Sequence, residues 1–198
     1  MSISGVILAG GMGRRMGGAD KGLIEFLGRP MIEHVAERLR PQVGEILINA
    51  NRELAHYGSL GYPVIEDEIG GFAGPLAGLH KAMLVAAHPY VLTVPCDSPL
   101  LPHNLAERLM NGLMERDADL AVAKTGIQSH PVFCLCKRSV HAHLRAFLDA
   151  GGRKIDAWYA TLPSVEVAFD DQAEAFSNIN TREELSAHAG RTGGDVSA

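Results

Sequence analysis

Cysteine is scarce in this sequence. Three cysteines in 198 residues are too few, and odd in number, for a fold held together by disulfides. Cys134 and Cys136 are two positions apart in an apolar segment, so on a strand they share one face, and Cys96 lies at the end of another apolar segment. We therefore expect buried free thiols in a reducing compartment, rather than a disulfide scaffold or a metal site.

Long apolar runs and an excess of basic residues are also absent. No stretch approaches the roughly 20 apolar residues of a membrane span, and the opening residues lack the cationic start of a signal peptide. The formal net charge is −5, and the basic residues are scattered except for Arg14 and Arg15. A nucleic-acid protein would show a basic stripe. We expect a cytoplasmic protein with neither a membrane nor a nucleic acid among its partners.

What the sequence does contain is a regular alternation of strand and helix patterns. With 46% hydrophobic residues it can bury one substantial core. We expect one domain over residues 1–189 and a disordered, glycine-rich tail over 190–198. The alternation predicts the α/β class, as a Rossmann-like three-layer sandwich with a mostly parallel sheet, a mixed edge and helices on both faces.

The expected elements follow from local apolar spacing. Strands are predicted at residues 6–8, 45–50, 63–65, 90–94, 120–123 and 132–136, and the last of these is a candidate for antiparallel pairing. Helices are predicted at residues 31–39, 53–57, 75–88, 105–114 and 141–148, with a capping box at 181–184 opening a final one.

A glycine-rich, cationic loop follows the first predicted strand, within residues 6–25. Glycines let main-chain N–H groups approach an anion closely, and cationic side chains add full charges. Such a loop is suited to a polyphosphate. The glycines are Gly10, Gly11 and Gly13, and the cations are Arg14, Arg15 and Lys21.

Two better-known phosphate loops do not fit this pattern. A dinucleotide fingerprint needs a third glycine where this chain has Met16. A Walker loop needs Gly-Lys-Ser/Thr, whereas Lys21 stands between Asp20 and Gly22.

Polar residues also follow the other predicted parallel strands, where ligands of open sheets bind. Asn49 offers donors and an acceptor to a base edge, or else forms a turn. Asp67 offers acceptors to the N–H groups of guanine, or else belongs to an acidic surface turn. Asp97 follows the strand YVLTV between two prolines and is placed to hold Mg2+ together with substrate phosphates, or else it is a cap.

The loop pattern resembles the molybdenum cofactor guanylyltransferases, the MobA-type nucleotidyltransferases, whose signature runs LAGG-x-x-x-RMGG-x-DK. The resemblance extends over nearly the whole ordered chain, and short motifs occur in the family's order. The related cytidylyltransferases usually read Ala-Ala-Gly where this chain has Ala9-Gly10-Gly11, which favours guanine. The further motifs lie at residues 48–52, 64–67, 74–78, 95–99, 130–131 and 176–181.

The resemblance implies a nucleotidyltransferase fold and specific site residues. Asp97 would bind Mg2+, and Arg15, Lys21 and Asp97 would be catalytic. His130, Asn178 and Asn180 would lie on the molybdopterin side. The residues implied in GTP binding are Leu8, Ala9, Gly10, Gly11, Lys21, Asn49, Asp67 and Asp97.

The implied reaction transfers GMP from GTP to the terminal phosphate of Mo-molybdopterin and releases diphosphate. Alternatives are a cytidylyltransferase of the same cofactor, a sugar-phosphate nucleotidyltransferase and a non-catalytic GTP-binding module. Transient contact with cofactor-insertion or molybdoenzyme partners also fits this setting.

Overall fold

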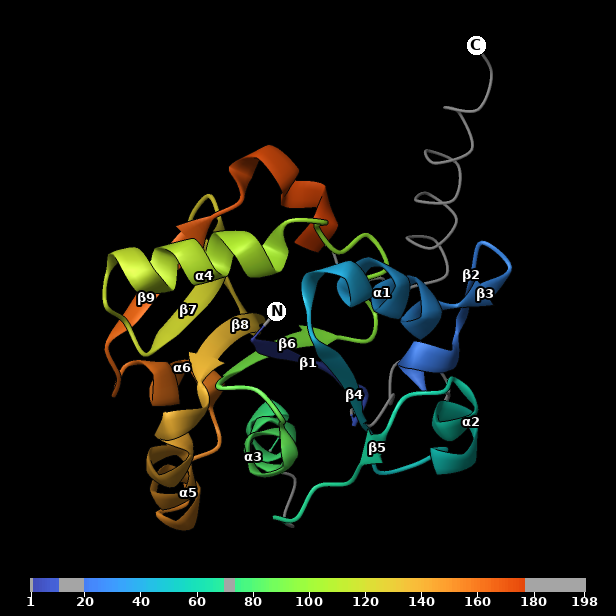
Figure 1. Ribbon diagram of the computed structural model, residues 1–198, viewed down its shortest axis with the longest axis horizontal. Coiled ribbons are helices and arrows are strands. Elements are labelled where there is room, and N and C mark those ends of the chain that lie inside the picture. The colour runs from blue at the N-terminus through green and yellow to red at the C-terminus, as the bar shows by residue number, and fades with distance from the viewer. Residues whose placement is uncertain (1, 11–19, 70–73, 177–198) are drawn as a thin grey trace.

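A computed structural model describes residues 2–10, 20–69 and 74–176 of the chain (Figure 1). Its centre is a seven-stranded sheet in the order β5-β4-β1-β6-β8-β7-β9. Four strands, β5, β4, β1 and β6, are parallel to one another, whereas β8 runs antiparallel to both β6 and β7. The edge strand β9 is parallel to β7. The strands are β1 Ile3–Leu8, β4 Glu45–Asn49, β5 Val64–Ile65, β6 Tyr90–Pro95, β7 Leu120–Thr125, β8 Gln128–Lys137 and β9 Ser164–Ala168.

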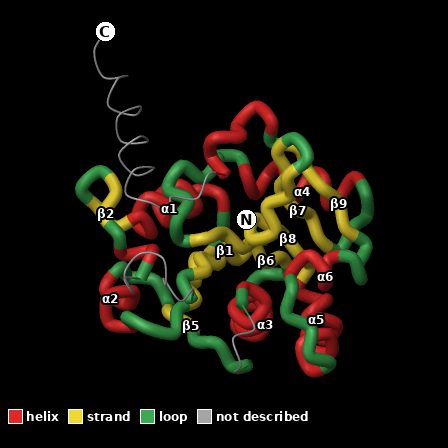
Figure 2. Tube along the Cα trace, turned by 180° about the vertical axis from the view of Figure 1, so that it is seen from behind, coloured by secondary structure: helices red, strands yellow, loops and turns green. Residues whose placement is uncertain are grey.

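Helices cover both faces of this sheet (Figures 1 and 2). One apolar cluster joins α1, α2 and α4 to the sheet, and a second joins α3, α5 and α6 to its other face. The α-helices are α1 Met31–Leu39, α2 Leu54–Ser59, α3 Pro75–Val85, α4 Leu105–Glu115, α5 His141–Asp149 and α6 Ile155–Tyr159. Single 3-10 turns lie at Lys21–Leu23, Arg40–Gln42 and Arg138–Val140, and a longer one at Asp170–Phe176.

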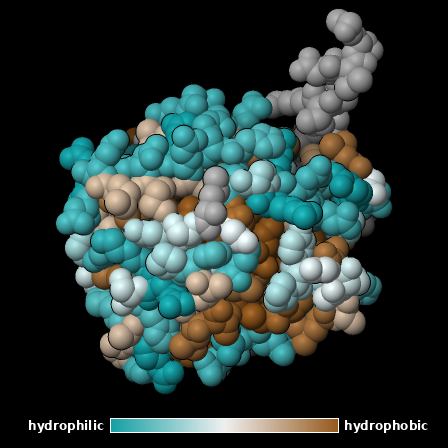
Figure 3. All heavy atoms as spheres, in the orientation of Figure 1, coloured by the Kyte–Doolittle hydropathy of each residue, from teal (hydrophilic) through white to brown (hydrophobic). Residues whose placement is uncertain are grey.

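The first strand shows why the sheet is covered on both faces. Ile3 and Ile7 belong to the first cluster and Val6 to the second, because successive side chains of a strand point to opposite faces. A parallel strand that is buried on both faces is therefore apolar throughout. Hydrophobic side chains also gather near the middle of the face seen in Figure 3, surrounded by hydrophilic ones.

The predicted α/β class and mixed edge are confirmed, and β8 is the antiparallel strand. β9, α6 and the small hairpin of β2 (Glu25–Phe26) and β3 (Arg29–Pro30) were not predicted from the sequence. In β9 the alternation of Val165 and Val167 with polar residues is the signal that was available. The expected capping box at 181–184 and the tail at 190–198 lie outside the described residues.

The three cysteines are buried and unpaired, as predicted. None of the helices in the described ranges has the length and apolar character needed to cross a membrane.

Candidate active site

Four parallel strands end in one row. The pairing sets Leu8 beside both Asn49 and Pro95, and Asn49 beside Ile65. The segments that follow these four residues therefore leave the same edge of the sheet. Because β4 and β6 lie on opposite sides of β1, this edge contains the point where the strand order reverses, at which open α/β sheets bind ligands.

The end of β1 is held by backbone hydrogen bonds from both sides. Ala9 N–H donates to the Asn49 carbonyl over 2.8 Å, and Cys96 N–H donates to the Leu8 carbonyl over 3.2 Å. Ala9 is buried, whereas Gly10 is exposed at the start of the glycine loop. The loop thus begins from a fixed point at the sheet edge.

Lys21 and Asp97 meet at this edge although 76 residues separate them. The Lys21 Nζ lies 3.0 Å from Asp97 Oδ2. The Asp97 side chain is 8% exposed, and that of Lys21 is 28% exposed. The ammonium of Lys21 is suited to neutralising phosphate charge in a site partly shielded from water, and a nearly buried carboxylate is suited to holding a cation there.

A second polar cluster lies next to the first, at the ends of β4 and β5. Asn49 Nδ2 donates to Asp67 Oδ1 over 2.9 Å, and Asn51 Nδ2 donates to Asp67 Oδ2 over 2.8 Å. The Asp67 N–H donates to Asn51 Oδ1 over 2.8 Å. Asn49 is buried and also donates to the Ile65 carbonyl, so it supports Asp67 from behind. Asn51 was not among the predicted site residues, although it stands two positions after Asn49.

His130 lies on β8, whose antiparallel direction brings its start to the same edge as the end of β6. Its ring stacks on Phe176 with centroids 4.8 Å apart, and its Nε2 lies 2.7 Å from Thr125 Oγ1. Burial lowers the pKa of His130, which favours a neutral ring. This contact places Phe176, the last described residue, beside His130.

A bulge in β8 sets the position of His130. Between Val122 and Ala123 the pairing of β7 jumps from Cys134 to His130, which leaves three β8 residues without a β7 partner. Two hydroxyl groups donate hydrogen bonds to carbonyl groups of this bulge. Thr93 Oγ1 donates to the Val132 carbonyl, and Tyr159 donates to the Pro131 carbonyl. Bulges next to active sites re-aim side chains in this way.

The predicted site residues are thus brought together where the structure describes them. Leu8, Ala9, Gly10, Lys21, Asn49, Asp67 and Asp97 all lie at or just beyond the same sheet edge. His130 lies on β8 as described above, and the other four predicted residues, Gly11, Arg15, Asn178 and Asn180, lie outside the described residues.

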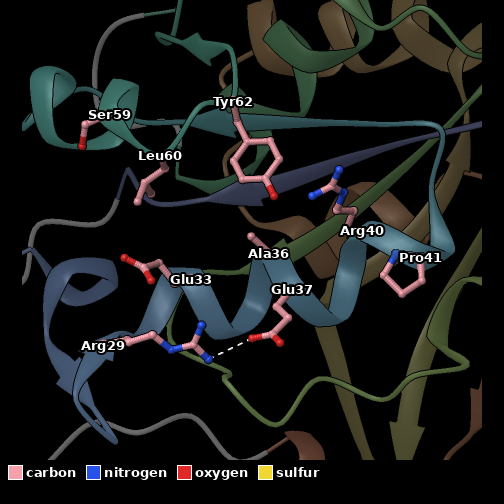
Figure 4. A pocket seen from close by; sticks show the side chains of 9 residues that line it. All are labelled: Arg29, Glu33, Ala36, Glu37, Arg40, Pro41, Ser59, Leu60 and Tyr62. Atoms are coloured by element: carbon pink, nitrogen blue, oxygen red, sulfur yellow. Dashed lines mark hydrogen bonds and ion pairs between the residues drawn. The ribbon is translucent and has the colours of Figure 1, made fainter.

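A groove of about 720 Å³ lies elsewhere, between α1 and the turn after α2. Figure 4 shows charged side chains of both signs along it, including the hydrogen bond from Arg29 to Glu37. None of the predicted site residues lines this groove.

The described residues contain no group of three or more His, Cys, Asp and Glu side chains that could hold a metal ion by themselves. A metal ion at this edge would therefore have at most two such side chains of the described residues as ligands. That donor set fits an ion whose remaining ligands are substrate phosphates and water.

Comparison with known proteins identifies the family. The model of the MobA-like NTP transferase domain matches residues 5–164. Molybdenum cofactor guanylyltransferase of Shewanella woodyi is 53% identical over 184 residues, which cover 93% of this chain and 94% of that protein. The protein of the same name from Shewanella sediminis is 52% identical over the same shares of the two chains.

Solved structures show the same fold at low sequence identity. The molybdopterin-guanine dinucleotide biosynthesis protein A of Archaeoglobus fulgidus is 23% identical, with a TM-score of 0.78 and coverage of 96% of this chain and 98% of that chain. The 4-diphosphocytidyl-2C-methyl-D-erythritol synthase of Anaerococcus prevotii is 13% identical, with a TM-score of 0.72 and coverage of 96% and 98%. The extent of the family match and the 53% identity together place this chain in the MobA-like NTP transferase family, as an enzyme of the nucleotidyltransferase class.

Proposed function

We propose that this protein transfers GMP from GTP to the terminal phosphate of Mo-molybdopterin, giving the guanine dinucleotide form of the cofactor and diphosphate. The observation that carries the proposal is the Lys21–Asp97 pair, 3.0 Å apart at the point where the strand order reverses. The relatives that are 53% identical are named for this activity.

The reaction requires two anions, the acceptor phosphate and GTP, to be aligned with each other. The acceptor phosphate attacks the α-phosphorus of GTP, and the bond to the diphosphate leaving group breaks. Lys21 offsets negative charge on the phosphates, and Arg15 is proposed to do the same from the glycine loop. Alignment and charge neutralisation supply most of the catalysis in such transfers.

Enzymes of this family generally use a divalent metal ion, and we propose Mg2+ held by Asp97. Mg2+ prefers oxygen ligands and is usually held by one or two carboxylates together with substrate phosphates. When bound, it supplies positive charge at the reacting phosphates. Asp97 already lies beside Lys21, so a nucleotide at this edge meets both groups at once.

The preference for guanine is assigned to Asp67. Its two carboxylate oxygens each accept one amide hydrogen bond, from Asn49 and Asn51. A carboxylate has about four lone-pair sites, so acceptor capacity remains for the N1–H and N2–H groups of guanine. Asn49 and Asn51 therefore fix the orientation of the group that reads the base.

The acceptor side is assigned to His130, with Asn178 and Asn180. The stacking of His130 on Phe176 supports this assignment, because it brings the segment before Asn178 to the same edge of the sheet. Transient contact with cofactor-insertion or molybdoenzyme partners and a cytoplasmic location belong to the proposal as well. The three unpaired thiols fit a reducing compartment.

The test is diphosphate release by the purified protein with Mg2+ and molybdenum-loaded molybdopterin, comparing GTP with CTP. Release with GTP alone supports the proposal. Release with CTP would show instead that the protein is a cytidylyltransferase. Binding of GTP without release, with this acceptor or with sugar phosphates, would leave a nucleotide-binding module.

Asp97→Asn is the decisive variant. Loss of the carboxylate should lower kcat by about 100-fold or more, while the melting temperature stays close to that of the parent protein. Lys21→Ala should mainly raise the KM for GTP. Asp119→Asn is the matched control, because Asp119 also pairs with a lysine, Lys137, over 2.9 Å, but at the opposite edge of the sheet.

A further inference from the structure

Asp20, the residue before Lys21, is a buried carboxylate with an unusual partner. It is 7% exposed and, among the described residues, accepts a hydrogen bond from the phenol of Tyr57 rather than from a cation. An aspartate before a helical turn ordinarily caps it with its side chain. The 3-10 turn that begins at Lys21 has no such side-chain cap. The carboxylate of Asp20 is thus directed to Tyr57 instead.

Tyr57 reaches this point from α2, and its side chain is fully buried. Burial and the hydrogen bond to Asp20 raise the pKa of Tyr57 far above its ordinary value. The phenol is therefore protonated at every pH at which the enzyme works, and it is a permanent donor to Asp20.

The same phenol packs against the residue after Lys21. A Cβ added to Gly22 would stand 2.8 Å from the Tyr57 hydroxyl and 3.1 Å from Cys96 Cβ. Gly22 therefore packs closely against both Tyr57 and Cys96. Since Cys96 directly precedes Asp97, this contact brings the turn that carries Lys21 against the turn that carries Asp97.

Both neighbours of Lys21 are thus fixed by one side chain. The Tyr57 hydroxyl bonds Asp20 and packs on Gly22, and the turn is closed by the hydrogen bond from Leu23 N–H to the Asp20 carbonyl over 3.1 Å. A lysine has a flexible four-carbon stem. Its ammonium is held 3.0 Å from Asp97 only if its backbone is held as well.

We propose that Tyr57 is a positioning residue for the transfer reaction, whose phenol holds Asp20 and Gly22 so that the Lys21 ammonium meets Asp97 and the nucleotide phosphates. This inference rests on the proposed function. It extends the site to α2, on which no site residue was predicted from the sequence.

The test is a double-mutant cycle of Tyr57→Phe with Lys21→Ala, measured on diphosphate release. Tyr57→Phe removes one hydroxyl and should lower kcat/KM for GTP by about 10- to 100-fold, because small displacements of a charged group are costly to catalysis. In the Lys21→Ala background the same substitution should change kcat/KM less than about twofold, since the group that it positions is gone. Equal losses in both backgrounds would overturn the proposal.

The control is Tyr62→Phe, which removes a phenol hydroxyl from a half-buried tyrosine beside α1, away from the site. It should leave kcat/KM unchanged. Thermal unfolding of all variants separates positioning from loss of fold.

A crystal structure of nucleotide-free Tyr57→Phe gives a readout that does not depend on the proposed activity. The positioning role predicts that the 3.0 Å contact between Lys21 and Asp97 is lost. If that contact persists, the positioning role is wrong even if the enzyme transfers GMP. If it is lost but the parent protein releases no diphosphate, the proposed function fails and the positioning role stands.

Discussion

Gly78 of α3 faces the side chain of Asn49 so closely that a Cβ on Gly78 would stand 2.2 Å from Asn49 Oδ1. No real Cβ is found so near an oxygen atom, so one of the two must move if the glycine is replaced. Asn49 is buried at the end of β4 and supports Asp67. α3 therefore leaves room for Asn49 at the proposed guanine site because residue 78 has no side chain.

Gly78→Ala should displace Asn49 and weaken its hydrogen bond to Asp67. We expect a loss of about 1–3 kcal/mol in the free energy of unfolding, which is typical of an overpacked site, and a higher KM for GTP. Gly58→Ala is the matched control, because nothing lies within 4 Å of a Cβ at this position inside α2. It should stabilise the protein by about 0.4–1 kcal/mol. Equal effects of the two variants in chemical denaturation would contradict this reading.

The bulge in β8 predicts a role for the hydroxyl of Thr93. Thr93 is 1% exposed and donates to the Val132 carbonyl over 2.6 Å. Thr93→Val keeps the shape but leaves that carbonyl without its donor, which should cost about 1–3 kcal/mol in the free energy of unfolding. Thr93→Ser restores the donor and should recover part of the loss.

Thr161→Val serves as the control for Thr93, since Thr161 bonds the Trp158 carbonyl in an exposed turn. Thr161→Val should change the free energy of unfolding by no more than about 0.5 kcal/mol. If Thr93→Val lowered the free energy of unfolding no more than Thr161→Val does, the bulge would not depend on the Thr93 hydroxyl.

The pair of His80 and His141 predicts a loss of stability in mild acid. Their ring centroids lie 4.6 Å apart between α3 and α5, and both ring nitrogens of His80 are buried without a hydrogen-bond partner among the described residues. Burial, then the charges of His141 and Arg145, lower the pKa of His80, while Glu68 and Asp149 act in the opposite direction.

The direction of this pH dependence follows from the linkage of proton binding to folding. Below about pH 6.5 the unfolded chain binds a proton at residue 80 that the folded protein binds only at lower pH. The free energy of unfolding should therefore fall as the pH drops through that window, by up to about 1.4 kcal/mol per pH unit. At pH 7 and above, His80 should contribute no pH dependence.

His80→Phe should flatten this acid slope, measured by urea unfolding between pH 5 and pH 7.5. An unchanged slope in His80→Phe would show that other groups cause the acid sensitivity.

The buried thiols predict slow chemical modification. Burial raises the pKa of Cys96, so its reactive thiolate form is rare at neutral pH. We expect no reaction of the native protein with a thiol reagent at pH 8 on the scale of minutes, and three reactive thiols after denaturation. One thiol that reacted rapidly in the native protein would show that a cysteine is accessible.

The local pattern of the sequence determined most of the secondary structure and the chemistry of the site. Apolar runs predicted β1, β4 and β6, because strands buried on both faces consist mostly of apolar residues. The rule that ligands bind beyond the ends of parallel strands then singled out Asn49, Asp67 and Asp97. The resemblance added the substrates and the family, and the comparisons confirmed the family.

Only the tertiary structure decided how these residues meet. Lys21 and Asp97 are 76 positions apart, and their contact depends on β1 and β6 being neighbours and on the packing of Gly22 against Cys96. Asn49 was expected to offer its amide to a base, but in the fold it donates to Asp67 and to the Ile65 carbonyl. The role of Tyr57 could not be read from an apolar spacing, which reports burial and not the partner of a hydroxyl group. Periodicity along the chain encodes which face of an element is buried, whereas the contacts at the strand ends depend on strand order and register, which form only when the whole sheet assembles.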